Sequence, residues 1–163
     1  MTFQHSVPRH LLTPIGDMTV SFAALELHMQ AVLIFLLDQT ARIGHILASQ
    51  LSFTRLRATI LALHKERYGE NSDYLKLKEF MTRAANIEEE RNRITHSFWG
   101  AGEIPGTIRR LKITAHVKHG LNFENKVYDE KMLNHFAESI RQLTDEFIIF
   151  YEALLPVSKT DNP

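Results

Sequence analysis

Two side chains with complementary chemistry, Arg91 and His96, lie in one short segment, and Asn92 directly follows the arginine. A planar guanidinium can bind two oxygens of a phosphate and stabilise charge that builds up there. A histidine can accept and donate protons near neutral pH. These groups suffice for one metal-independent reaction on RNA, in which the ribose 2′-hydroxyl attacks the adjacent phosphate. The products would be a 2′,3′-cyclic phosphate and a free 5′-hydroxyl. DNA lacks the attacking hydroxyl.

Arg91 lies on the apolar stripe of a helix that the sequence predicts from about Asp73 to Trp99. Spacings of three and four residues, typical of a core-facing stripe, connect Leu77, Phe80, Ala84, Ile87, Arg91, Ile94 and Phe98. An unpaired buried guanidinium is costly. Arg91 is therefore expected to be paired, to face a cleft, or to lie at a subunit interface.

The helical spacing sets limits on how these residues meet. Asn92 and His96 are four residues apart, so they share a helix face and the amide could orient the imidazole. Arg91 and His96 lie about 140° apart around the same helix. A two-fold dimer that brings both copies of the segment to one cleft would remove this difficulty.

An arginine followed five to seven residues later by a histidine is a weak signal, because Arg57 and His64 also satisfy it. Only the segment RNRITH, residues 91–96, also has asparagine after the arginine and histidine at the fifth position. In this respect, and in its position late in a long helix, the segment resembles the R-N-x-x-x-H motif of the HEPN superfamily. The resemblance covers the helical framework from about Asp17 to Leu155.

The resemblance implies a metal-independent endoribonuclease that acts as a homodimer with a composite site at the interface. Carried over, Arg91 and His96 would be catalytic and Asn92 would support them. Many such proteins are toxins or phage-defence effectors that a partner protein, such as an antitoxin, holds in check. Other members of the superfamily are inactive binding modules. The alternative is therefore a catalytically inactive helical dimerisation module, in which Arg91 fixes the register of the dimer.

Other polar residues are candidates for supporting roles. The supporting candidates at the site are Glu26 and Thr95, and the candidates for RNA binding are Arg93, Arg109, Arg110 and Lys112. Simpler interpretations exist for most of them. Glu26 would occupy the solvated edge of its helix, and Arg93 would pair with Glu89 four residues earlier. The cations at 109–118 would protect the edge of a sheet.

No metal or other cofactor is predicted. The chain has no cysteine, so thiolate sites and disulfides are excluded. His116 and His119 would point to opposite faces of a strand. The paired Glu-x-x-His motifs of a di-iron bundle are absent.

The elements that would position these residues form a mainly α fold. We expect a four-to-five-helix, HEPN-like bundle with a β-hairpin, 107–128, inserted before the last helix, because the apolar period changes there from 3.6 to 2. Helices are expected at 18–39, 40–49, 53–68, 73–99 and 129–155, after an arm at 1–13 and before a polar tail at 157–163. The hairpin turn is expected near Gly120, and 100–106 is expected to be a loop.

Composition is consistent with one domain, residues 1–163, because 44% apolar and 23% charged residues are ordinary values for a globular protein. The 19 basic and 19 acidic residues cancel, so RNA binding would need a local basic patch. The N-terminus has no apolar core typical of a secretory signal. The apolar run 31–37 is too short to span a bilayer. A cytoplasmic protein without membrane attachment is expected.

Overall fold

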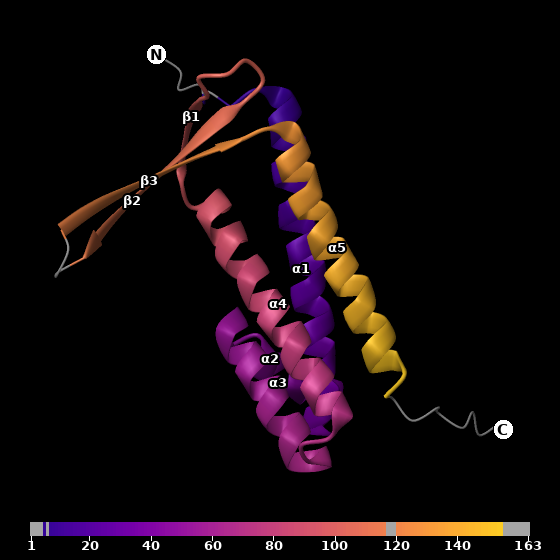
Figure 1. Ribbon diagram of the computed structural model, residues 1–163. Helices are drawn as coiled ribbons and strands as arrows, with labels where there is room; N and C mark the ends of the chain where they lie inside the picture. Colours follow the sequence, from indigo (N-terminus) through magenta and orange to yellow (C-terminus); the bar gives the residue numbers. More distant parts are fainter. Residues whose placement is uncertain (1–4, 6, 117–119, 155–163) are drawn as a thin grey trace. The chain divides into compact units, whose positions relative to one another are not determined.

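The computed structural model describes residues 5, 7–116 and 120–154, and within them the chain forms five helices and three strands (Figure 1). The elements are α1 (Arg9–Leu37), α2 (Ala41–Ala48), α3 (Phe53–Tyr68), α4 (Ser72–Thr95), β1 (Phe98–Ala101), β2 (Ile108–His116), β3 (Gly120–Tyr128) and α5 (Glu130–Glu152). The expected mainly helical fold, with a hairpin before the last helix, is confirmed.

The chain divides into two compact units, each built from discontinuous segments. The sheet unit comprises Met1–Phe22 and Asn86–Ile140, and the helical unit comprises Ala23–Ala85 and Arg141–Pro163. Helices α1, α4 and α5 contribute residues to both units. The single-domain organisation stays a prediction.

Helix α1 begins earlier than the sequence predicts. It starts at Arg9, and Pro14 lies inside it. Val7 and Leu11 are buried, so the expected loose arm at 1–13 is wrong for its described part. Proline is favoured in the first turn of a helix, but Pro14 lies further inside α1. Here the burial of upstream apolar residues stabilises a helix that proline alone would not favour.

Helix α1 is also long and apolar enough to cross a membrane. Its 29 residues include an 18-residue window with a mean hydropathy of 1.9, of which 39% is buried in the structure. The expectation of no membrane attachment rested on the unbroken run 31–37, which is much shorter than this window. A buried core helix passes the same test of length and composition.

Both ends of α3 and the start of α4 carry the local signals that the sequence predicts. Helix α3 begins after Ser52, whose side chain accepts a hydrogen bond from the amide of Arg55, and it ends at Gly69, where φ is 77°. Helix α4 begins after Asn71, whose Oδ1 accepts from the amide of Tyr74 over 2.9 Å. Side-chain caps and a terminal glycine are local signals, so these boundaries could be predicted from the sequence.

The end of α4 differs from the prediction. The helix stops at Thr95, and Phe98 and Trp99 belong to β1, which pairs antiparallel with β2. Phe98 is 67% exposed, so its predicted core position is wrong, whereas Leu77, Ala84 and Ile94 of the stripe are fully buried. Part of the predicted loop 100–106 is strand for the same reason: pairing with β2 draws these residues into the sheet.

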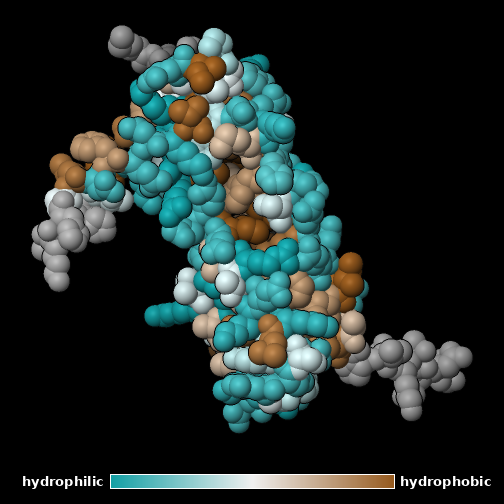
Figure 2. All heavy atoms as spheres, viewed as in Figure 1, coloured by the Kyte–Doolittle hydropathy of each residue, from teal (hydrophilic) through white to brown (hydrophobic). Residues whose placement is uncertain are grey.

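The sheet has the order β1-β2-β3, with antiparallel pairs throughout. Side chains alternate between its two faces. One face is buried where β2 begins and β3 ends, at Ile108 and Tyr128. The opposite face carries exposed apolar residues, namely Phe98, Ile113, Leu121, Phe123 and Val127, and Figure 2 shows apolar surface on the hairpin. The predicted hairpin is confirmed, but the turn residues 117–119 lie outside the described residues.

Helix α5 is capped by Asp129, whose Oδ1 accepts a hydrogen bond from the amide of Met132 over 2.7 Å. In the helical unit, Phe147 packs edge-on against Phe80 of α4, with ring centres 5.9 Å apart. Glu146 pairs with Arg83 over 2.5 Å. The predicted polar tail, 157–163, lies outside the described residues.

Candidate active site

Arg91 lies near the C-terminal end of α4, in the sheet unit, and its guanidinium is held on two sides. Nη1 donates a hydrogen bond to Oδ1 of Asn92 over 2.7 Å. Cζ lies 4.3 Å from the centre of the Phe22 ring of α1, within the range of a cation–π interaction. Among the described residues, Arg91 forms no ion pair with a carboxylate. Its positive charge is therefore not neutralised within the described structure.

The three nitrogens of this guanidinium have different environments. Nε is buried and has no hydrogen-bond partner. Nη2 makes no hydrogen bond within the described residues and is not buried. The guanidinium thus has one edge fixed by Asn92 and one nitrogen open to solvent, an arrangement that leaves donors for an oxyanion.

The remaining motif residues lie at and just beyond the helix end. The amide of His96 donates to the carbonyl oxygen of Asn92 over 3.0 Å, and the His96 side chain is exposed. The Thr95 hydroxyl donates to the carbonyl oxygen of Arg91 over 2.9 Å. The oxygen of the Asn92 side chain accepts from Arg91, so only its NH2 group is left to orient the imidazole, and that role stays a prediction. The His96 side chain is accessible to solvent.

Glu90, directly before Arg91, connects α4 to the sheet. Its Oε1 accepts hydrogen bonds from Nζ of Lys126 and from the hydroxyl of Tyr128, each over 2.7 Å. Both donors belong to β3, which lies more than thirty residues later in the chain. The Tyr128 ring also packs against Trp99 of β1, with ring centres 5.4 Å apart. The sheet therefore holds the helix at the residue that precedes the candidate catalytic arginine.

These contacts shift the pKa values of both partners. Burial alone would raise the pKa of the Glu90 carboxyl, but the hydrogen bonds from Lys126 and Tyr128 outweigh burial and lower it. Burial, with the Glu90 carboxylate beside it, raises the pKa of the Tyr128 hydroxyl. Glu90 is thus a charged hydrogen-bond acceptor at neutral pH.

The predicted pairing of Arg93 is confirmed. Its Nη2 bonds Oε1 of Glu89, and its Nη1 lies 3.6 Å from Oε2 of Glu90. With two carboxylates beside it, Arg93 offers less positive charge to a phosphate than its sequence position suggests. A role in RNA binding stays a prediction.

The predicted basic cluster on the hairpin is not one exposed strip. Arg110 is fully buried and paired with Glu124, which corrects its assignment as an RNA-binding residue. Arg109 lies on the opposite face, because successive strand residues alternate, and it pairs with Glu103 over 3.2 Å. Lys112 shares the face of Arg110 and is partly exposed.

The remaining predicted features are Glu26 and the histidines of the hairpin. Glu26 belongs to the helical unit, where it is partly exposed, and its supporting role stays a prediction. Within the part of the chain that the structure describes, no three side chains of His, Cys, Asp or Glu come together as a metal site. His119 and the side chain of His116 lie outside the described residues.

The chain matches no protein-family model, no curated protein and no solved structure. The likeness to the HEPN superfamily therefore remains a resemblance based on the segment 91–96 and the helical framework.

The sequence alone did not predict the contact between Glu90 and Tyr128 or the burial of Arg110. The roles of Glu90 and Tyr128 depend on a contact between residues 38 positions apart, and no local pattern encodes such a contact. Arg110 was classed with its basic neighbours, although its alternation with Arg109 already places the two on opposite faces. In a short sheet packed on helices, one of those faces must be buried.

Proposed function

We propose that this protein is a metal-independent endoribonuclease whose catalytic residues are Arg91 and His96. The observation that carries the proposal is the state of Arg91: its guanidinium is oriented by Asn92 and Phe22, forms no ion pair among the described residues, and has one open nitrogen. An exposed histidine five residues later supplies the proton-transfer group. An arginine that served only as a structural ion pair would have a carboxylate partner.

In the proposed reaction, the neutral imidazole of His96 removes the proton of the ribose 2′-hydroxyl. The 2′-oxygen forms a bond to phosphorus while the bond from phosphorus to the 5′-oxygen breaks. Arg91 stabilises the negative charge on the non-bridging phosphate oxygens. The departing 5′-oxygen takes a proton from water or from the imidazolium of a second copy, which a two-fold dimer would bring to the same cleft. Within this proposal Asn92 is a positioning residue.

The test is cleavage of a mixed RNA pool, including tRNA, in excess EDTA, with analysis of the product ends. We expect the wild-type protein to produce 2′,3′-cyclic phosphates. Removal of a general acid–base group lowers the reaction rate by about 100-fold or more. His96→Ala should therefore reduce the cleavage rate by at least that factor. Arg91→Ala should reduce it by a similar factor, because the loss of one oxyanion donor costs about 100- to 1,000-fold.

Matched controls come from the same unit. Arg9→Ala removes an exposed arginine of α1, and His135→Ala removes an exposed histidine of α5. Both variants should retain most of the activity. Equal cleavage by wild type and all four variants would show that the activity comes from elsewhere. No cleavage by folded wild-type protein would favour the second candidate.

The second candidate is a catalytically inactive helical interaction module. It is favoured by the buried, unpartnered Nε of Arg91 and by the packing of its guanidinium on Phe22, because both are typical of a residue that fixes local structure. In that case Arg91→Ala would destabilise the protein, whereas His96→Ala would change no measured property.

A further inference from the structure

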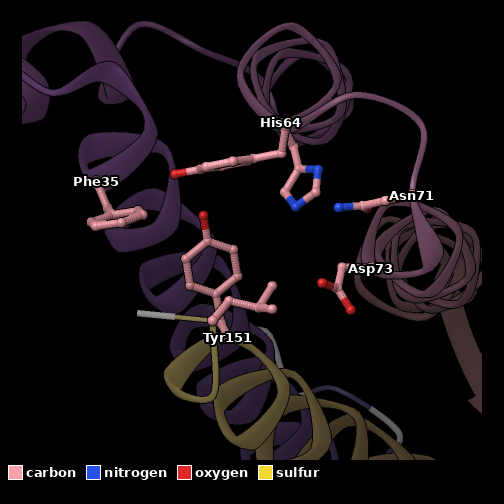
Figure 3. Close-up of a pocket in the computed structure, with 7 residues that line it drawn as sticks. Phe35, His64, Asn71, Asp73 and Tyr151 are labelled. Carbon is pink, nitrogen blue, oxygen red and sulfur yellow. The ribbon is translucent and has the colours of Figure 1, made fainter. Parts of the chain in front are cut away.

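The helical unit contains a cavity of about 190 Å³ that lies apart in sequence from the motif of α4 (Figure 3). Its lining comes from four helices, or from the residues just outside them, and includes Phe35, His64, Tyr68, Asn71, Asp73 and Tyr151. A dry cavity of about 150 Å³ is large enough for benzene. This cavity is therefore large enough for one small organic molecule.

His64 is the most unusual residue of the lining. Its side chain is 2% exposed, and its Nδ1 is buried without a hydrogen-bond partner. The other ring nitrogen, Nε2, points into the cavity beside Asn71 and Asp73 (Figure 3), and no residue of the described structure bonds it. Burial lowers the pKa of His64, and the Asp73 carboxylate offsets only part of that effect. The imidazole is therefore neutral at pH 7 and can accept a hydrogen bond through Nε2.

The cavity wall carries one carboxylate. Among the described residues that line the cavity, Asp73 alone has a formal charge at pH 7, because His64 is neutral and none of them is a lysine or an arginine. Arg67 is not part of this lining, although its charge acts on Tyr151 and is shared with Asp38 at 3.9 Å. Three of the contributing helices, α1, α3 and α5, present their last turns here, through Phe35, Tyr68 and Tyr151. Helix C-termini carry partial negative charge. Helix α4 alone presents its N-terminus.

Aromatic rings form much of the wall. The rings of Phe35 and Tyr151 meet edge to face with centres 6.0 Å apart, and the rings of His64 and Tyr68 lie 5.1 Å apart. Faces of Tyr and Phe rings attract cations. Tyr68 and Tyr151 also bring hydroxyl groups to the lining, and their oxygens can accept hydrogen bonds.

We propose that this cavity is a binding site for a small organic cation, an amine of about four to eight non-hydrogen atoms. The Asp73 carboxylate pairs with the ammonium group, Nε2 of His64 accepts one of its hydrogen bonds, and the rings of Phe35, Tyr68 and Tyr151 surround the carbon skeleton. The proposal does not depend on ribonuclease activity.

The test is titration of the full-length protein at pH 7 with benzylammonium and, separately, with benzyl alcohol, which has the same ring and no charge. Binding is measured by calorimetry and by the imidazole ¹⁵N signals of His64, assigned by comparison with His64→Gln. We expect saturable binding of the cation, at least about tenfold tighter than that of the alcohol. The bound state should show His64 protonated on Nδ1, which leaves Nε2 as the acceptor.

Two substitutions test whether the Asp73 carboxylate is the group that binds the cation. Asp73→Asn keeps the shape and removes the charge, so it should weaken benzylammonium binding by about tenfold or more and leave benzyl alcohol unchanged. Asp38→Asn is the matched control, since Asp38 is an exposed aspartate of the same unit that lies 3.9 Å from Arg67 and outside the cavity. It should bind like wild type. Circular dichroism verifies folding.

Phe35→Leu gives a test that does not depend on Asp73. It removes one aromatic wall and keeps an apolar side chain, so it should weaken trimethylammonium binding by about threefold or more. Equal affinity for cation and alcohol would overturn the proposal, as would the absence of any change in the His64 signals with all probes. An equal loss in Asp38→Asn and Asp73→Asn would also overturn it, because the effect would then come from net charge alone.

Discussion

The hydrogen bond from Tyr128 to Glu90 provides a sharp test of how the sheet is fixed to α4. Tyr128→Phe removes the donor and keeps the ring packed against Trp99. A hydrogen bond to a charged group contributes about 1.5–3 kcal/mol to stability. The Glu90 side chain is 21% exposed, so solvent screening reduces the expected loss to about 1–2 kcal/mol. For a chain of this length, that loss corresponds to a fall in Tm of about 2–8 °C.

The same prediction has a pH signature. The pKa of Glu90 is lowered in the folded state, so its contribution to stability is fully present above the unfolded-state pKa, about 4.3. The contribution is lost as the pH falls through the lower folded-state value. The stability difference between wild type and Tyr128→Phe should therefore be largest near pH 7 and should shrink below about pH 4.

Urea unfolding, followed by circular dichroism at pH 7 and pH 3.5, measures both effects. Lys126→Met is the matched control, because it removes an exposed partner of the same carboxylate, and such a pair contributes at most about 1 kcal/mol. If Tyr128→Phe were as stable as wild type at pH 7, or if its loss were equal at both pH values, the charged hydrogen bond would not be what holds the sheet at Glu90.

Four further substitutions test other parts of the fold by urea unfolding at pH 7. Glu124→Gln should lower the free energy of unfolding by about 1–3 kcal/mol, because it removes the carboxylate paired with the buried guanidinium of Arg110, and the 45% exposure of Glu124 reduces the cost typical of a buried pair. Arg110→Met should lower it by less, and a reversed order would show that the pair is not what stabilises Arg110. Gly44→Ala should lower the free energy of unfolding by about 1–3 kcal/mol, because the added Cβ would lie 2.8 Å from Cγ2 of Ile34. Unchanged stability would show that the neighbouring side chain moves aside at no cost. Gly69→Ala should lower the free energy of unfolding by about 1–2 kcal/mol. The cause is backbone strain at a φ of 77°, because no atom lies within 4 Å of the added Cβ.

Local signals account for the parts of the fold that could be predicted from the sequence. Ser52 and Gly69 mark the ends of α3 through a side-chain cap and a residue with positive φ. Asp129 marks the start of α5 through a hydrogen bond to its first turn. Each signal acts within four residues, which is the range that sequence patterns encode.

The features that were missed depend on distant partners. Strand β1 has only four residues, one of them glycine, and it forms because β2 pairs with it. The start of α1 at Arg9 depends on the burial of Leu11 rather than on capping chemistry. No local pattern predicts the burial of His64 beside Asp73, because that burial requires helices α3 and α4 to meet at their ends.

The position of the sheet gives the hairpin a role that its sequence did not suggest. Lys126 and Tyr128 bind Glu90, and the indole N–H of Trp99 donates to the carbonyl oxygen of Ile94 over 3.0 Å. These contacts bracket Arg91 on both sides along α4. Within the described residues, the Arg91 guanidinium is supported directly by the Asn92 amide and the Phe22 ring, so its position depends on the rigidity of its own backbone. In the proposed enzyme, Tyr128→Phe would therefore reduce cleavage without touching substrate, and the loss would accompany the loss of stability. If stability fell and activity were fully retained, the contacts of the sheet would stabilise the fold without affecting catalysis.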